Sequence, residues 1–215
     1  MNYASARRLD GRGKAARGQT YKRSQLMAES GAGELRPGRA RPGFRPDLTP
    51  RIETARMILR GWTIDDFEPL AEMMADPECG RFITANSKPL DATACWFNMA
   101  TLAGMWAVQG YGLFVMEEKS TGRFLGRTGP FHPIGWPGLE VGWGLHPAAR
   151  GKGYATEAAR AAMAWARSEL GAREIVHVIA VDNAPSRAVA ERLGAKAGKR
   201  IELFGRMSEI WVSHP

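Results

Sequence analysis

One short segment, residues 145 to 157 (LHPAARGKGYATE), constrains this chain more than any other. A strand pattern runs through a turn of small residues directly into an Ala-rich helix pattern. The first N–H groups of a helix lack intrahelical partners, and the helix dipole makes that end positive. Gly151 and Gly153 let the main chain approach a ligand closely, while Arg150 and Lys152 add positive charge. The segment therefore predicts a site for a phosphate or pyrophosphate group.

The familiar nucleotide-binding motifs do not fit this turn. A P-loop requires Ser or Thr after Gly-Lys, but Gly153 follows Gly151 and Lys152. A dinucleotide fingerprint that starts at Gly151 requires Gly or Ala at the position of Thr156. The string from Gly11 to Ala16 matches that fingerprint, but no strand pattern precedes it. The turn thus predicts an anion site without predicting a P-loop or a dinucleotide fold.

Periodicity along the rest of the chain predicts a mixed α/β domain. Alternating and β-branched segments favour strands, and apolar residues at helical spacing favour helices. The resulting order, β-α-α-β-β-β-α-β-α-β, indicates one sheet with helices on both faces. Strands are expected over 55–62, 111–118, 123–131, 139–145 and 174–181, with one or two more in 199–212; helices are expected over 64–75, 91–108, 156–170 and 184–193.

Charge divides the chain near residue 46. Residues 1–46 carry eleven Lys or Arg against three acidic residues, whereas residues 47–215 carry 19 of each. The first part consists largely of Gly, Arg, Ala and Pro and has too few apolar residues to offset its ordering entropy. We expect 1–46 to be a disordered basic tail and 47–215 to be the folded domain. The tail suits either an arm that contacts nucleic acid or the ribosome, or a dispensable extension.

Cysteine and histidine usage narrows the class of protein. Cys79 and Cys95 are sixteen residues apart, which fits neither a CxxC motif nor a disulfide scaffold. The four His residues lack metal-ligand spacing among themselves or with the cysteines. No apolar run approaches the roughly 18 residues that a membrane span requires. These observations favour a reduced, cytoplasmic protein without a metal site or a membrane segment.

The turn carries the pattern Arg-x-x-Gly-x-Ala, from Arg150 to Ala155, after a strand interrupted by two glycines. Here the chain resembles the GNAT superfamily of acyl-CoA-dependent N-acetyltransferases. The string HPAARGKGYATEAARAAMAWA looks especially similar to the ribosomal-protein N-terminal acetyltransferase (Rim-type) branch. The resemblance covers roughly residues 48 to 212 and includes the segment from Asn183 to Ser186. It implies a mixed, mostly antiparallel sheet with helices on both faces and strands that splay apart at the acetyl-CoA site.

The resemblance also implies the parts of an acetyl-CoA site, with acetyl-CoA as cosubstrate and no metal. The pantetheine arm would run between the strand that ends at Leu145 and the strand that ends at Val181. Asn183 would contact that arm, and Ser186 would lie near the sulfur. Arg150 would lie beside the pyrophosphate. The pyrophosphate would bind the N–H groups of five residues: Gly151, Lys152, Gly153, Tyr154 and Ala155.

The reaction that the resemblance implies is direct attack of a neutral primary amine on the acetyl thioester. A backbone N–H near Leu145 would stabilise the developing oxyanion. Glu140, on the same strand, is the candidate base and would act through a water molecule. Many relatives place a Tyr acid seven residues after the Asn, but this chain has Ala190 there. Ser186 is the candidate acid in its place.

Each of these residues also fits a purely structural role. The glycine turn can serve simply as the entry to a helix. Glu140 fits an ordinary residue on the solvent side of a strand, Asn183 a helix cap, and Ser186 a first-turn residue. The seven Trp residues fit core and pocket wall better than a nucleic-acid stacking platform. Three of them, Trp96, Trp106 and Trp136, are candidates to line an acceptor groove.

The leading functional prediction is a cytoplasmic N-acetyltransferase that uses acetyl-CoA and acts on a primary amine, with a protein N-terminal α-amine as the first acceptor class. One alternative is an N-acetyltransferase of a small-molecule amine or antibiotic. Another is a non-catalytic acyl-CoA-binding module, and a third is a ribosome- or RNA-associated protein led by its tail. Both a monomer and a homodimer fit the sequence.

Overall fold

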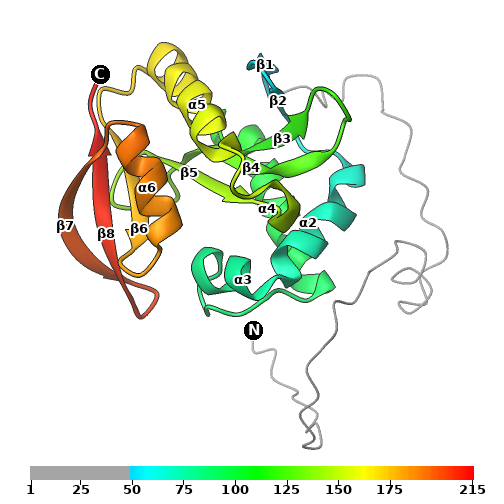
Figure 1. The fold of residues 1–215 in the computed structure, drawn as a ribbon, viewed down its shortest axis with the longest axis horizontal. Coiled ribbons are helices and arrows are strands. Elements are labelled where there is room, and N and C mark those ends of the chain that lie inside the picture. The colour runs from blue at the N-terminus through cyan, green and yellow to red at the C-terminus, as the bar shows by residue number, and fades with distance from the viewer. Residues whose placement is uncertain (1–48) are drawn as a thin grey trace, which may run out of the picture.

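A mixed eight-stranded sheet is the centre of the structure, a computed structural model that describes residues 49–215 (Figure 1). The strand order is β1-β2-β3-β4-β5-β6-β8-β7, and every neighbouring pair is antiparallel except β5 and β6. This arrangement confirms the expected mixed, mostly antiparallel sheet. The predicted tail, residues 1–46, lies outside the described residues.

The elements follow the chain in nearly the predicted order. The strands are β1 (Ile52–Glu53), β2 (Met57–Arg60), β3 (Phe114–Glu118), β4 (Phe124–Phe131), β5 (Glu140–Leu145), β6 (Ile175–Ala180), β7 (Lys196–Leu203) and β8 (Arg206–Ser213). The helices are α2 (Phe67–Ala75), α3 (Pro77–Ile83), α4 (Ala92–Gln109), α5 (Tyr154–Leu170) and α6 (Ala184–Arg192), with short 3-10 turns at η1 (Ile64–Asp66) and η2 (Pro147–Ala149).

Helices cover both faces of the sheet, as predicted. On one face, Val141 of β5 belongs to a core cluster with the alanines of α5, whose small side chains let this helix lie close to the strands. Ile179 of β6 packs with Ala190 of α6 in a neighbouring cluster. On the other face, α2, α3 and α4 enclose a second core of Leu70, Ala71, Met73, Met74, Cys79, Cys95 and Met99.

Asp76 and Pro77 separate two helices instead of ending helical structure. The preceding helix, α2, ends at Ala75 as expected, but Pro77 is the first residue of α3. Proline suits this position because the N–H that it lacks has no intrahelical partner there. The Asp76 carboxylate accepts a hydrogen bond from the Cys79 N–H at 3.0 Å and so caps α3. Seven residues are too few to display helical periodicity, which is why α3 was not predicted.

Other element boundaries also differ from expectation, and β3 begins at Phe114 instead of residue 111. The first predicted strand, 55–62, is shortened to β2, and the short strand β1 pairs with it. The helix α5 begins at Tyr154, two residues early, because Gly153 is its N-cap. The one or two strands expected in 199–212 are two, and β7 begins three residues early, at Lys196. A tight turn at Phe204 and Gly205 joins β7 to β8, and the φ angles of these two residues are both positive, at 52° and 70°.

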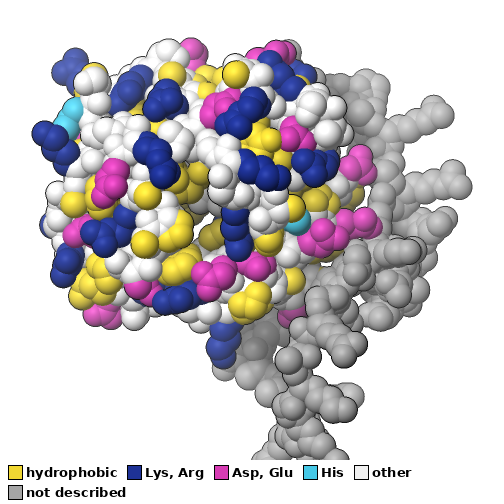
Figure 2. Space-filling model, viewed as in Figure 1, with side chains coloured by type: hydrophobic (Ala, Val, Ile, Leu, Met, Phe, Trp, Pro, Cys, Tyr) yellow, Lys and Arg dark blue, Asp and Glu magenta, His cyan; other side chains and the backbone are white. Residues whose placement is uncertain are grey.

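The surface of the folded part carries both signs of charge. Figure 2 shows Lys and Arg side chains interspersed with Asp and Glu on the face that it displays. No helix within residues 49–215 is long and apolar enough to cross a membrane. In the same range, no group of three or more His, Cys, Asp or Glu side chains is arranged to hold a metal ion. Cys79 and Cys95 are both buried and unpaired by disulfides.

Candidate functional site

The strands β5 and β6 meet at one end and separate toward the other. Their parallel ladder is limited to the pair Glu140 and Val176, whereas β5 pairs with β4 along its whole length. Side chains replace part of the missing ladder. The His177 Nδ1–H of β6 donates to the Val141 carbonyl at 2.8 Å, and burial lowers the pKa of this histidine to about 4, so that it stays neutral. Beyond Glu140 and Val176 the two strands share no ladder as far as Leu145, and we call this unpaired stretch between β5 and β6 the gap.

The turn between η2 and α5, residues 150–153, follows Leu145 at the open end of this gap; because the sequence predicts a phosphate site there, we call it the phosphate turn. The helix α5 begins directly after Gly151 and Gly153, which adopt left-handed φ angles of 76° and 78°. No side chain caps α5, whereas Asp76, Asp91 and Asn183 cap α3, α4 and α6. The first N–H groups of α5 therefore have no side-chain acceptor. A Cβ at Gly151 would meet no atom within 4 Å, which leaves room above the turn for a ligand.

The two predicted cations flank the turn, and both have partners. The Arg150 guanidinium donates to the Asp76 carboxylate at 2.6 Å and lies 3.0 Å from the Cys79 sulfur. It therefore ties the turn to the junction of α2 and α3. The Lys152 ammonium donates to the Ala148 carbonyl at 3.0 Å. Both side chains stay exposed enough to contribute positive charge at the rim.

Arg56, between β1 and β2, holds the phosphate turn from the other side. Its Nη1 donates to the Lys152 carbonyl at 2.9 Å, and its Nε donates to the Glu157 carboxylate at 2.7 Å. Its guanidinium also lies 4.5 Å from the centre of the Tyr154 ring. The Tyr154 hydroxyl donates to Glu118 at 2.6 Å, so this buried side chain is held between Arg56 and Glu118. Sequence reasoning missed Arg56, about a hundred residues away in the chain.

Glu140 is buried at the closed end of the gap, which contradicts a position on the solvent side. One carboxylate oxygen accepts from the Trp136 indole N–H at 2.6 Å, and the other accepts from the Val178 N–H at 3.3 Å. A Cβ at Gly142 would lie 3.5 Å from the Glu140 Oε1, so the carboxylate extends over a part of β5 that has no side chain. Burial raises the pKa of Glu140 to about 7 despite these two donors.

Asn183 and Ser186 lie at the start of α6, just after β6. The Asn183 side-chain oxygen accepts from the Ser186 N–H at 3.2 Å, so the predicted capping role is present. Ser186 is half-buried, and no hydrogen bond joins it to Glu140. The structure places the predicted site residues at both ends of the gap. Glu140 lies at the closed end, whereas the turn residues follow β5, and Asn183 and Ser186 follow the parallel strand β6, at the open end.

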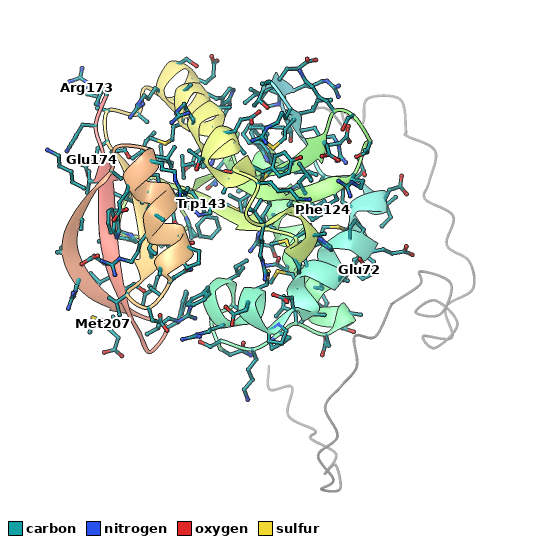
Figure 3. All side chains as sticks on the ribbon, viewed as in Figure 1. Glu72, Phe124, Trp143, Arg173, Glu174 and Met207 are labelled. Carbon is teal, nitrogen blue, oxygen red and sulfur yellow. The ribbon has the colours of Figure 1, made fainter. Side chains whose placement is uncertain are left out.

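The candidate acceptor-groove tryptophans separate into different environments. Trp136 contacts Glu140, as described above. Trp106 is buried in the core against Phe114, and Trp96 is 44% exposed on α4. A further tryptophan, Trp143 of β5, is labelled in Figure 3. Its ring centre lies 5.1 Å from that of His177 on β6. Strand alternation alone did not indicate that Trp143 would line this gap.

The comparisons with known proteins agree with this geometry. The family model "Acetyltransferase (GNAT) domain" matches residues 56–196, which include β5, the phosphate turn, β6 and α6. The matched range is well over half of the chain. The chain belongs to the GNAT acetyltransferase family, and its fold agrees with that membership.

Individual relatives support the family and the fold. The protein YkkB of Bacillus subtilis is 33% identical over 107 residues, which span 48% of this chain and 62% of YkkB, less than two thirds of its length. An acetyltransferase from Agrobacterium tumefaciens has a TM-score of 0.70 and 28% identity, over 83% of this chain and 100% of that one. RimL, described as a ribosomal L7/L12 alpha-N-protein acetyltransferase in complex with coenzyme A, has a TM-score of 0.63 and 16% identity, over 77% of this chain and 98% of RimL.

The glycine turn generates the first prediction. In Gly153→Val we expect acetyl-CoA to bind more than about tenfold more weakly, because valine tolerates a φ of 78° poorly and its Cβ would lie 3.5 Å from the Arg56 guanidinium that holds the turn. Isothermal titration calorimetry measures the Kd. The matched control is Gly171→Val, at the other end of α5, where glycine has a φ of 65° and open surroundings. An equal loss of acetyl-CoA affinity in the two variants would contradict the assignment of the turn at Gly153 as part of the acetyl-CoA site.

The contacts of Arg56 generate the second prediction. Arg56→Ala removes the hydrogen bonds to Lys152 and Glu157, so we expect the Kd for acetyl-CoA to rise by about tenfold while the fold persists. Calorimetry and thermal melting measure these two effects. Arg200→Ala is the control, because the exposed Arg200 side chain, on β7, pairs with the largely buried Glu209 at 3.5 Å and makes no contact with the turn. An unchanged Kd in Arg56→Ala would show that Arg56 does not position the turn.

Proposed function

We propose that this protein is an N-acetyltransferase that transfers an acetyl group from acetyl-CoA to a primary amine, with a protein N-terminal α-amine as the leading acceptor class. The observation that carries the proposal is the open start of α5 beside the gap between β5 and β6. A buried carboxylate, Glu140, lies at the closed end of the same gap. Membership of the GNAT family supports acetyl-CoA as the acyl donor.

The turn residues are the proposed partners of the diphosphate of acetyl-CoA. The main-chain N–H groups of Gly151, Lys152, Gly153, Tyr154 and Ala155 lie at the positive end of α5, and no side chain caps that end. Arg150 is the proposed cation beside the diphosphate. Because Asp76 binds its guanidinium, Arg150 also keeps the turn in one position. These features fit a dianionic group that approaches the backbone closely.

The gap between β5 and β6 is the proposed path of the pantetheine arm. Backbone groups of β5 between Gly142 and Leu145 lack a ladder partner on the β6 side, and the amides of the arm can pair with them. Asn183 uses its side-chain oxygen to cap α6, which leaves its NH₂ group as a donor to the arm. Ser186, three residues further on, is the proposed acid beside the sulfur.

Glu140 is the proposed general base. When bound, acetyl-CoA supplies an activated acetyl thioester, and the acceptor must reach it as a neutral amine. A carboxylate with a pKa of about 7 accepts a proton from an ammonium group, through water, near neutral pH. The Trp136 and Val178 N–H groups hold this carboxylate in place. A backbone N–H near Leu145 is the proposed donor to the developing oxyanion.

A protein N-terminus is proposed as the acceptor on two grounds. The sequence around the turn resembles the Rim-type branch, and RimL, which shares the fold, is described as an alpha-N-protein acetyltransferase. The free cysteines suit a reducing compartment, and we propose the cytoplasm as the site of action. A role of residues 1–46 at the ribosome stays a prediction, because they lie outside the described residues.

A mass-spectrometric screen of peptide libraries and small amines tests the proposed function. Transfer of acetyl from acetyl-CoA to primary amines would support it, and the preferred acceptors would separate protein N-termini from small molecules or antibiotics. Binding of acetyl-CoA without transfer to any amine would instead favour the non-catalytic acyl-CoA-binding module.

The third prediction concerns Glu140 as the base. In Glu140→Gln we expect kcat to fall by at least about 100-fold, because general-base catalysis contributes roughly 100- to 10,000-fold. For the wild type, kcat/KM should rise as the pH passes through about 7, because Glu140 loses its proton there. Steady-state kinetics from pH 5.5 to 9 at saturating acetyl-CoA measure both. Unchanged turnover in Glu140→Gln, with an unchanged pH profile, would remove Glu140 from the mechanism.

The fourth prediction concerns Trp136 as a positioning residue for Glu140. The indole N–H stabilises the carboxylate, so its removal in Trp136→Phe should raise the pKa of Glu140 further and move the rising limb of the pH profile to higher pH. The control is Trp62→Phe, which removes an indole donor that binds the Leu113 carbonyl and not Glu140. If the rising limb of the pH profile lies at the same pH in Trp136→Phe as in the wild type, this hydrogen bond does not set the pKa of Glu140.

A further inference from the structure

An aromatic cluster lies directly beside the Glu140 carboxylate. Trp136, whose N–H binds Glu140, meets Phe131 edge to face, with 5.1 Å between ring centres and an interplanar angle of 89°. On another side, Trp136 faces Phe204, with 6.2 Å between ring centres and a 42° tilt. We call Phe131, Trp136 and Phe204 the aromatic rim. The rim brings together the end of β4, the loop before β5 and the turn between β7 and β8.

Phe204 occupies a position that stability alone does not explain. It is the first residue of a two-residue turn in which both residues have positive φ, a turn for which Asn-Gly is strongly preferred. A bulky residue with a φ of 52° costs conformational energy, and its side chain is 61% exposed, so burial does not offset that cost. Backbone strain of this kind clusters at ligand sites.

The turn that carries Phe204 is fixed in place by its neighbour Arg206. The Arg206 guanidinium donates to the Thr84 carbonyl and to the Ser87 hydroxyl, both at 2.9 Å, and so ties the turn to the connection between α3 and α4. Ser87 also has a positive φ, of 57°. Phe204 is therefore held near Trp136 by contacts from a distant part of the chain.

We propose that the aromatic rim binds a large apolar group attached next to the acceptor amine. This proposal rests on the proposed function, because Glu140 then marks where the amine must lie. An amine held one water molecule away from the Glu140 carboxylate presents its substituent to the neighbouring surface, and there Trp136 contacts Glu140 while Phe131 and Phe204 extend the same aromatic surface. The substrate class is thus a primary amine with an aromatic or branched aliphatic substituent, such as a peptide that begins with Phe or Leu.

Matched peptides that differ only in their first residue test this proposal. We expect wild-type kcat/KM to be at least about tenfold higher for a peptide beginning with Phe than for one beginning with Ser, because apolar contacts of this size discriminate by one to two orders of magnitude. Phe204→Asn should remove most of that preference by lowering kcat/KM for the Phe peptide alone. Its Tm should equal or exceed that of the wild type, because Asn suits the left-handed turn.

Controls and contrary outcomes separate this proposal from the proposed function. Val108→Asn removes an apolar side chain that is 87% exposed on α4, and it should leave the preference unchanged. Equal kcat/KM for the two peptides in the wild type, or equal losses for both in Phe204→Asn, would overturn the rim as a specificity site. Sedimentation measures the oligomeric state of the wild type and of Phe204→Asn. If the substitution converts a dimer to a monomer and leaves the peptide preference unchanged, the rim is an interface between two copies of the chain, and the proposal is also overturned. Failure of the wild type to acetylate any amine would instead overturn the proposed function itself, and the substrate class would fall with it.

Discussion

Unpaired backbone N–H groups at the start of α5 are the feature on which the rest of the candidate site depends. A side chain usually accepts a hydrogen bond from the first N–H groups of a helix. In this chain Asp76, Asp91 and Asn183 do so at the starts of α3, α4 and α6. At α5 the acidic residue of the first turn, Glu157, binds Arg56 instead. The donors therefore stay available to a ligand, and the helix dipole gives that ligand a preference for negative charge.

The gap between β5 and β6 couples this anion site to a reactive carboxylate. Two parallel strands would normally satisfy each other's backbone groups, but here the His177 ring and the Glu140 side chain take over where the strands separate. Glu140 is thereby buried with two donors and no cationic partner, which is why its pKa rises. The same irregularity thus accounts for both the space in the sheet and the altered acidity beside it.

The parts of the site that depend on local sequence could be predicted, and the parts that depend on distant contacts could not. Helix α5, the turn before it and the Asn183 cap each follow from residues within a few positions of one another. Other features join residues that are far apart in the chain, so no periodicity reveals them. They are the hydrogen bond of Arg56 to Lys152, the ion pair of Arg150 with Asp76, and the contact of Trp136 with Phe204. Helix α3 was missed for another reason, because its seven residues show no repeat.

A crystal structure of the protein with coenzyme A bound is the most direct test of this account. We predict that diphosphate oxygens lie about 2.7–3.2 Å from main-chain nitrogens of residues 151 to 155, with the pantetheine arm between β5 and β6. Coenzyme A bound elsewhere, with the turn vacant and the two strands closed on each other, would contradict the account.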